Sequence, residues 1–339
     1  MRAFTRHALA RAFTRRALAR ALARRAFAAT ALLPGLARAQ DWAPERSVRI
    51  VVPYAPGGAN DILARLLAQR FTERLGQPVV VENRPGAQAM LGTQHVAQAR
   101  PDGLTLLVAA SGPITVSPAV NPRTPYRPLV ELAPVSMIAS FPLLLLVRAD
   151  APFRDVAGLA DWARRNASRA NYASSAASFQ LATELFKQRT QTAFQHVAYR
   201  GSADSTNAVA SGEVTMALVD AGPATAALEG GRVRALATTA QSRLPSLPDV
   251  PTMSEAGISG MEVLLWSALF APAGTPTPAI ARLAAETAAA VAAPDIAARI
   301  TAYRMTAAAD GPDALRATIA RELLLWAEVA RAGQIRFEE

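Results

Sequence analysis

The sequence predicts an α/β protein of two lobes, in which two mixed or mostly parallel sheets carry helices on both faces. Two observations lead to this fold class. Short apolar runs alternate with amphipathic segments in two successive series along 339 residues, and such alternation favours right-handed crossovers between parallel strands. Strand-like segments near residues 140 and 235 lie at the ends of these series, so we expect the chain to cross between the lobes twice.

The first series begins at the β-branched run Val48–Val52, which predicts a buried strand. Apolar residues in 59–75 then recur at helical spacing, and Gly76 follows where a helix stop is expected. A proline-rich stretch at 112–134 is predicted to be irregular. Between them we expect strand 79–81, helix 92–99 and strand 104–109.

The second series follows two strand-like segments that Phe141-Pro142 is expected to separate. These boundaries predict a discontinuous first lobe, 40–142 plus 236–339, and a second lobe, 143–235. The last helix is expected to begin at Pro312. The elements predicted in between are helix 155–165, strand 170–173, helix 178–189, strand 195–199, helix 203–211, strand 214–219, helix 223–229 and strand 233–239, followed by a proline-rich stretch and the segment 261–271.

The basic character of the chain is concentrated at its N-terminus. Residues 1–40 hold nine arginines and no acidic residue, so a net charge of +10 leaves +1 for residues 41–339. A positive region, a short apolar run and Ala37-Arg38-Ala39 predict an export signal over 1–39, cleaved after Ala39. Arg24-Arg25 also fits a twin-arginine signal, so the Sec and twin-arginine routes both stay open. The alternative is an arginine-rich arm for nucleic acid or for mitochondrial targeting.

Composition and missing motifs exclude several functions. The chain has no cysteine, which excludes disulfides, thiol catalysis and zinc–thiolate sites. Beyond the signal, no apolar run approaches the roughly 18 residues of a membrane span. The sequence motifs of serine hydrolases, dinucleotide-binding folds, phosphate-binding loops and zinc proteases are absent. His95 and His196 are predicted to be structural. We therefore predict no catalytic residue, no metal and no cofactor, and a binding protein instead of an enzyme.

Several phrases resemble those of the tripartite tricarboxylate transporter receptors, also called the Bug family of periplasmic solute-binding proteins. Among them are "VPYAPGGANDILARLLAQR", "VVENRPGAQAMLGTQHVAQARPDGLTLLV" and "VRALATTAQSRLPSLPDVPTMSEAG". The resemblance extends over nearly all of 45–330. It implies a type II-like periplasmic binding protein fold that closes like a Venus flytrap around a small carboxylate. It also implies a periplasmic location and, as partner, either the membrane subunits of the transporter or a periplasmic sensor. We further predict a monomer without a nucleic-acid partner.

The stretch "VPYAPGGAND" joins the first predicted strand to the first predicted helix. Its prolines stiffen the loop, and its glycines leave backbone N–H groups open to a ligand. These amides precede a helix, whose partly positive N-terminus can bind a carboxylate without an arginine. The alternative is a structural turn in which Asp61 complements the helix dipole. With a second strand-end loop, the predicted contacts of this lobe are Tyr54, Ala55, Pro56, Gly57, Gly58, Ser111 and Gly112.

The second lobe is expected to supply loops at three further strand ends. Its serines offer hydroxyls to a ligand, and the amides among them open a helix. Family members tend to have a longer, glycine-containing loop and a Gln-His pair here. This chain has Gln180-Leu181, which predicts a pocket of different shape and lower polarity. Arg200 could instead point to solvent, and Asp220 and the serines could merely cap helices. The predicted contacts are Ser174, Ser175, Ala176, Ser178, Arg200, Gly201 and Asp220.

Overall fold

The computed structural model describes residues 42–335. The predicted export signal, with its arginines and its cleavage position, lies outside the described residues. Within 42–335, every helix is too short or too polar to cross a membrane.

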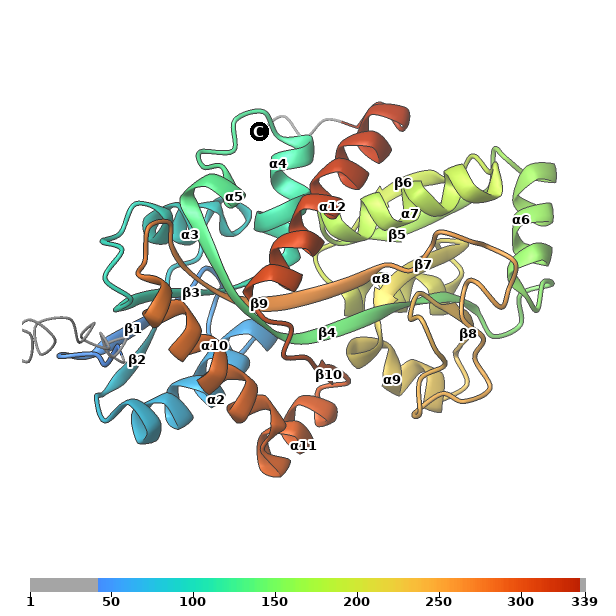
Figure 1. Cartoon of the computed structure of the whole chain (residues 1–339). Helices are drawn as coiled ribbons and strands as arrows, with labels where there is room; N and C mark the ends of the chain where they lie inside the picture. Colours follow the sequence, from blue (N-terminus) through green and yellow to red (C-terminus); the bar gives the residue numbers. More distant parts are fainter. Residues whose placement is uncertain (1–41, 336–339) are drawn as a thin grey trace, which may run out of the picture. The chain divides into compact units, whose positions relative to one another are not determined.

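Ten strands of the described chain form one curled, mixed sheet (Figure 1). They are β1 (Val48–Val52), β2 (Val79–Asn83), β3 (Thr105–Ala110), β4 (Leu132–Arg148), β5 (Asn171–Ser174), β6 (Gln195–Ala198), β7 (Met216–Asp220), β8 (Val233–Thr238), β9 (Leu264–Pro272) and β10 (Thr306–Ala307). The main order is β2-β1-β3-β9-β4-β7-β5-β6, and β8 and β10 also pair with β4. The pairs of β1 with β2 and β3, and of β5 with β6 and β7, are parallel. The long strands β4 and β9 pair antiparallel to their neighbours.

Helices cover both faces of the sheet, as the sequence predicts. They are α2 (Ala59–Leu75), α3 (Met90–Ala97), α4 (Ser117–Val120), α5 (Pro128–Glu131), α6 (Val156–Arg165), α7 (Ala177–Thr190), α8 (Ser202–Ser211), α9 (Ala221–Glu229), α10 (Thr277–Ala292), α11 (Pro294–Ala302) and α12 (Pro312–Ala332). Alternate residues of β1 point to opposite faces. Ile50 belongs to a core cluster with residues of α2, α10 and α11, whereas Val51 belongs to a second cluster with residues of α3 and α12. In the second half, Leu145 packs with α6 and α7, and Leu146 packs with α8 and α9.

The helix after β1 confirms the sequence prediction at both ends. α2 spans Ala59–Leu75, and Leu63, Leu67 and Phe71 bury one of its faces. Gly76 follows with φ +70°, a left-handed conformation that ends the helix and favours glycine.

The predicted break at Phe141-Pro142 is wrong, because β4 runs without interruption from Leu132 to Arg148. Residues up to Pro142 pair with β9, and residues from Leu143 onward pair with β7 and β8. The proline lacks an N–H to donate. It lies where β4 changes partners, so the continuous strand passes from one half of the sheet to the other.

The proline-rich stretch at 112–134 is also more regular than predicted. It contains a π-helical turn (η2, Gly112–Val116) and the short helices α4 and α5. Pro113, Pro118 and Pro128 each lie in the first turn of one of these elements. The missing N–H of a proline has no helical partner there in any case.

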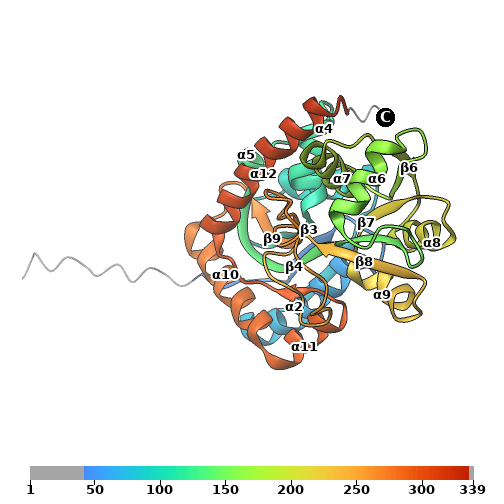
Figure 2. The same cartoon turned by 90° about the vertical axis from the view of Figure 1, so that its right-hand side faces the viewer.

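The terminal helix α12 connects the two halves of the structure (Figures 1 and 2). Near its start, Leu315 and Ile319 pack in a core cluster with residues of β1, β3 and β9. Near its end, Trp326 and Val329 pack with residues of β5 and α7. The helix also contacts α4 and α5. Its apolar face therefore belongs to the cores of both halves.

Candidate functional site

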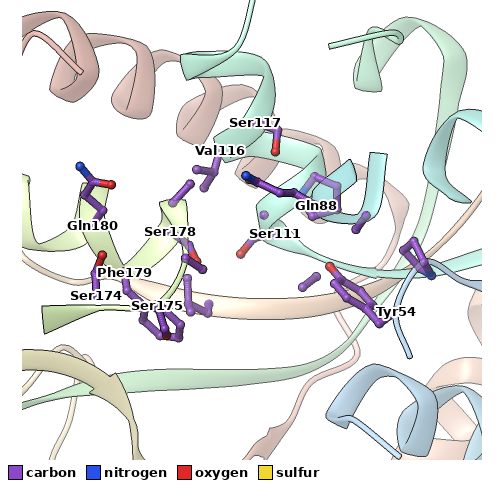
Figure 3. A pocket seen from close by; sticks show the side chains of 18 of the residues that line it. Tyr54, Gln88, Ser111, Val116, Ser117, Ser174, Ser175, Ser178, Phe179 and Gln180 are labelled. Atoms are coloured by element: carbon purple, nitrogen blue, oxygen red, sulfur yellow. The ribbon is translucent and has the colours of Figure 1, made fainter. Parts of the chain in front are cut away.

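A cavity of about 660 Å³ lies where loops from the two halves converge (Figure 3). The loops that line it follow the carboxyl ends of β1, β2, β3, β5 and β6. Open α/β sheets place ligand sites at this end of their strands. The structure brings eight of the predicted contacts to this cavity: Tyr54, Ala55, Ser111, Gly112, Ser174, Ser175, Ala176 and Ser178.

One wall of the cavity begins at Ser111, directly after β3. The residue is 2% exposed, and its hydroxyl has no hydrogen-bond partner within the described chain. Figure 3 shows this hydroxyl directed into the cavity. A buried hydroxyl without a partner carries a desolvation cost that a ligand acceptor would relieve. Ser111 is therefore placed to donate to a bound molecule.

The first turn of α7 forms the facing wall. Ala176 is the N-cap, and none of the described side chains caps this 14-residue helix. Its first turn also contains no acidic residue. The alternative that the serines at 174–178 only cap a helix is therefore wrong, because none of them caps α7. The first N–H groups of α7 open toward the cavity as donors.

The glycine-rich loop contributes less than the sequence predicts. Tyr54 and Ala55 line the cavity, but Pro56, Gly57 and Gly58 are exposed and do not. The Gly57 N–H donates to Asp61 Oδ2 over 2.9 Å, so this amide is already used. Burial raises the pKa of Tyr54, and a hydrogen bond with the Ala110 backbone only partly offsets this effect. Its phenol therefore stays neutral.

Asp61 ties the loop to its neighbours. The carboxylate is 3% exposed and accepts from Gly57, from Arg65 Nε at 2.9 Å and from Asn83 Nδ2 at 3.0 Å. Burial opposes its ionisation, but these hydrogen bonds outweigh burial and hold its pKa below the ordinary value. Its role is wider than the predicted dipole complement, because it fixes the shape of the loop beside the cavity.

Ser174 and His196 form a pair at the cavity. Ser174 Oγ lies 2.7 Å from His196 Nε2, and both residues line the cavity. They lie on the adjacent parallel strands β5 and β6. The sequence predicts a structural role for His196, because an apolar strand does not reveal which loop its side chains meet.

Besides Pro56, Gly57 and Gly58, three further predicted contacts lie outside this cavity. Arg200, which is exposed, and Gly201 do not line this cavity. Asp220 lines a second cavity of about 480 Å³, beside the start of α9 and the end of α11. Its carboxylate accepts from Ser202 Oγ and does not cap α9. Phe141 borders both cavities.

Sequence reasoning missed several cavity residues. Gln88 lies in a turn, Ala87–Ala89 (η1), whose three residues all have positive φ, with Gln88 at +51°. Such a run is costly for non-glycine residues and recurs at ligand sites. The available signal was the "NRPG" that follows β2, since it is a strand-end loop like the others. The further lining residues that it missed include Ser117, Phe179 and Tyr199, whereas Gln180, which the sequence placed at the pocket, does line it.

The cavity is electrostatically unusual for an anion site. Of the described residues that line it, none is Asp, Glu, Lys or Arg. Burial, followed by the influence of nearby Glu213, raises the pKa of Tyr199 to about 12, so this side chain is also neutral. Within 42–335, His, Asp and Glu side chains form no group that could hold a metal ion. The site offers hydroxyls, amides and apolar walls.

Known proteins resemble this chain both in sequence and in structure. A family model described as "Tripartite tricarboxylate transporter family receptor" matches residues 63–332. A protein from the tcbD-tcbE intergenic region of Pseudomonas sp. (strain P51) is 37% identical over 303 residues, or 88% of this chain and 90% of that protein. The structure of R. palustris Rpa4515 with adipate has a TM-score of 0.74 and 33% identity, covering 87% of this chain and 99% of that one. MatC from Rhodopseudomonas palustris with bound malate has a TM-score of 0.70 and 33% identity, covering 84% of this chain and 99% of that one.

Proposed function

This chain belongs to the tripartite tricarboxylate transporter family of receptors, as its sequence predicts, and we propose that it captures a small carboxylate between two lobes in the periplasm. It then delivers this ligand to the membrane subunits of a transporter. The proposed lobes are 40–142 plus 236–339 and 143–235. The proposed hinges are β4 near Pro142 and the segment that follows β8.

One observation carries this proposal: the unpartnered hydroxyl of Ser111 faces a cavity onto which the uncapped start of α7 also opens. A carboxylate can accept from both sources at once. Hydrogen bonds from neutral donors to an ionised acceptor are stronger than those between neutral groups. The donors come from the two halves of the structure, so a ligand between them would hold the halves together.

The structural relatives support the same ligand class. One of them holds adipate and another holds malate, and both of these molecules are small carboxylates. The volume of the cavity, about 660 Å³, also lies within the range of roughly 300–1,000 Å³ that small-molecule sites occupy.

Ligand binding is tested on the mature protein, beginning at Gln40 and stripped of ligand by unfolding and refolding. Thermal-shift and calorimetric screens use mono-, di- and tricarboxylates, amino acids and aromatic acids. We expect a carboxylate to bind, and Ser111→Ala to weaken that binding by about 10- to 150-fold, since a hydrogen bond to a charged group contributes about 1.5–3 kcal/mol. The exposed Ser259→Ala is the control. Indifference to every acid contradicts the proposal.

Location and delivery need separate measurements. N-terminal sequencing of the exported protein should give Gln40 as its first residue. Uptake of the bound acid should require both this receptor and the membrane subunits in the same cells. Uptake that continues at the same rate without the receptor contradicts its role in delivery.

A further inference from the structure

The pair of Ser174 and His196 has a chemistry that carboxylate binding alone does not use. Ser174 is 4% exposed, its Oγ lies 2.7 Å from His196 Nε2, and both residues line the cavity. A hydroxyl has one hydrogen to donate, and an imidazole nitrogen either donates or accepts. Only one of the two groups can therefore supply the hydrogen between them.

The protonation of the ring decides which group donates. When Nε2 is unprotonated, it accepts the hydrogen of Ser174, and the cavity meets only lone pairs of that oxygen. When Nε2 carries a proton, it donates to Ser174 Oγ, and the serine hydrogen must turn toward another acceptor. A protonated ring enforces this second arrangement because both of its nitrogens are donors. A carboxylate in the cavity is such an acceptor.

We propose that His196 is a positioning residue that turns the Ser174 O–H toward the bound carboxylate, and so couples ligand binding to the uptake of a proton. This inference rests on the proposed function of the cavity. It adds a pH dependence to that function, and it assigns a role to a histidine that the sequence left as structural.

The surroundings of His196 allow its charge to change. Its ring lies 5.1 Å from the ring of Tyr172 on β5. Helix α7 contributes Glu184 and Lys187, which form an ion pair with an N–O distance of 2.8 Å. Glu184 also accepts a hydrogen bond from the Tyr172 hydroxyl. Burial lowers the pKa of His196, Glu184 raises it, and Lys187 lowers it further. The ring is therefore mostly neutral near neutral pH in the free protein.

A bound anion reverses part of this balance. Its negative charge favours the protonated ring, so the pKa of His196 is higher in the complex than in the free protein. By linkage, affinity must then rise as pH falls through the pKa of the complex, and it levels off below the pKa of the free protein.

The experiment is titration calorimetry of the mature protein with adipate at about pH 6, 7 and 8, the range in which histidines titrate. At about pH 6.5, two buffers of different ionisation enthalpy report the number of protons taken up. We expect proton uptake on binding and a several-fold gain in affinity from about pH 8 to about pH 6. In His196→Gln, whose amide does not titrate in this range, both effects should fall to the small share that adipate itself contributes. His95→Gln is the control, because His95 on α3 lies outside the cavity lining.

Ser174→Ala separates positioning from direct contact. This variant should take up fewer protons on binding adipate than wild type, because the hydroxyl that His196 turns is missing and only the direct attraction between the anion and the protonated ring remains. Equal proton uptake by wild type and His196→Gln overturns the inference. Proton uptake in Ser174→Ala equal to that of wild type overturns the positioning role. If adipate does not bind, the acid that binds in the screen takes its place. Indifference to every acid of the screen overturns the proposed function together with this inference, whereas binding without proton uptake overturns only the inference.

Discussion

Two adjacent glycines in the loop after β1 have different reasons to be glycine. Gly57 has φ +86°, whereas Gly58 has an extended backbone with φ −79°. An added Cβ at either position would meet no heavy atom closer than 3.9 Å. Conformation therefore distinguishes the two positions, and crowding does not.

A pair of substitutions tests this distinction. Gly57→Ala should lower the free energy of unfolding by about 1–2 kcal/mol, the cost of a left-handed backbone for a residue with a Cβ. Gly58→Ala should change it by less than about 0.5 kcal/mol, as expected where no strain arises. Urea denaturation of both variants checks this. Equal losses would mean that the loop adopts another backbone conformation.

Asp61 provides a second prediction at this scale, now with a pH dependence. Asp61→Asn should lower the free energy of unfolding at neutral pH by about 1–3 kcal/mol, because three donors lose a buried, ionised acceptor. The pKa of Asp61 is depressed, so its stabilisation is full above the pKa of the unfolded chain and is lost as pH falls through the folded value. The deficit of the variant should accordingly shrink in acid. Denaturation at about pH 7 and about pH 3 measures it, with the exposed Asp204→Asn as control.

Among the elements, α12 is held in place by a partly buried acid. Glu322 accepts from Thr115 Oγ1 on η2 and from Trp266 Nε1 on β9, each over 2.9 Å. Burial raises the pKa of Glu322, and the two hydrogen bonds lower it by less. This carboxyl links the helix to the turn that begins beside Ser111.

The raised pKa of Glu322 predicts how stability changes with pH. The protonated form fits the fold better than the ionised form, so this group stabilises most at low pH. Its contribution falls as pH rises from its ordinary value of 4.5 through the raised value. Glu322→Gln cannot ionise, so it should gain stability relative to wild type over that range. Paired denaturation curves at about pH 4.5 and 7.5 test this, with Glu328→Gln on the same helix as control. A constant difference would contradict it.

Elements with a local cause were predictable, and those with a distant cause were not. α2 follows from its own spacing and from Gly76, so both of its ends were predicted. β4 continues through Pro142 because its pairing partner changes there from β9 to β7. No local pattern in the sequence predicts this change of partner. The same holds in the site. The strand ends at Ser111 and Ser175 were predictable, but the partner of the Gly57 amide and the meeting of Ser174 with His196 depend on the tertiary fold.

In the whole molecule, residues 42–335 do not divide cleanly into two independent parts. β4 contributes strand pairs to both halves, and α12 packs into the cores of both. Neither half would keep its core if the other unfolded.

We therefore expect the mature protein to unfold in a single transition. Scanning calorimetry should give a ratio of calorimetric to van't Hoff enthalpy of about one, the signature of two-state behaviour. Two resolved transitions would show that the halves fold independently and that the shared strand and helix contribute little.

The neutrality of the cavity lining has a consequence for the medium in which the receptor works. Dissolved salt screens Coulomb attraction beyond a Debye length of about 10 Å at 0.1 M, but it leaves hydrogen bonds at contact distance nearly untouched. A site lined by arginines would bind its ligand more weakly as the salt concentration rises. At about pH 8, where His196 is neutral, this one should bind its acid with a dissociation constant that changes less than about twofold between roughly 0.05 and 0.5 M sodium chloride, and a steep loss over that range would reveal a hidden cation. Capture would then be insensitive to changes in the ionic strength of the medium.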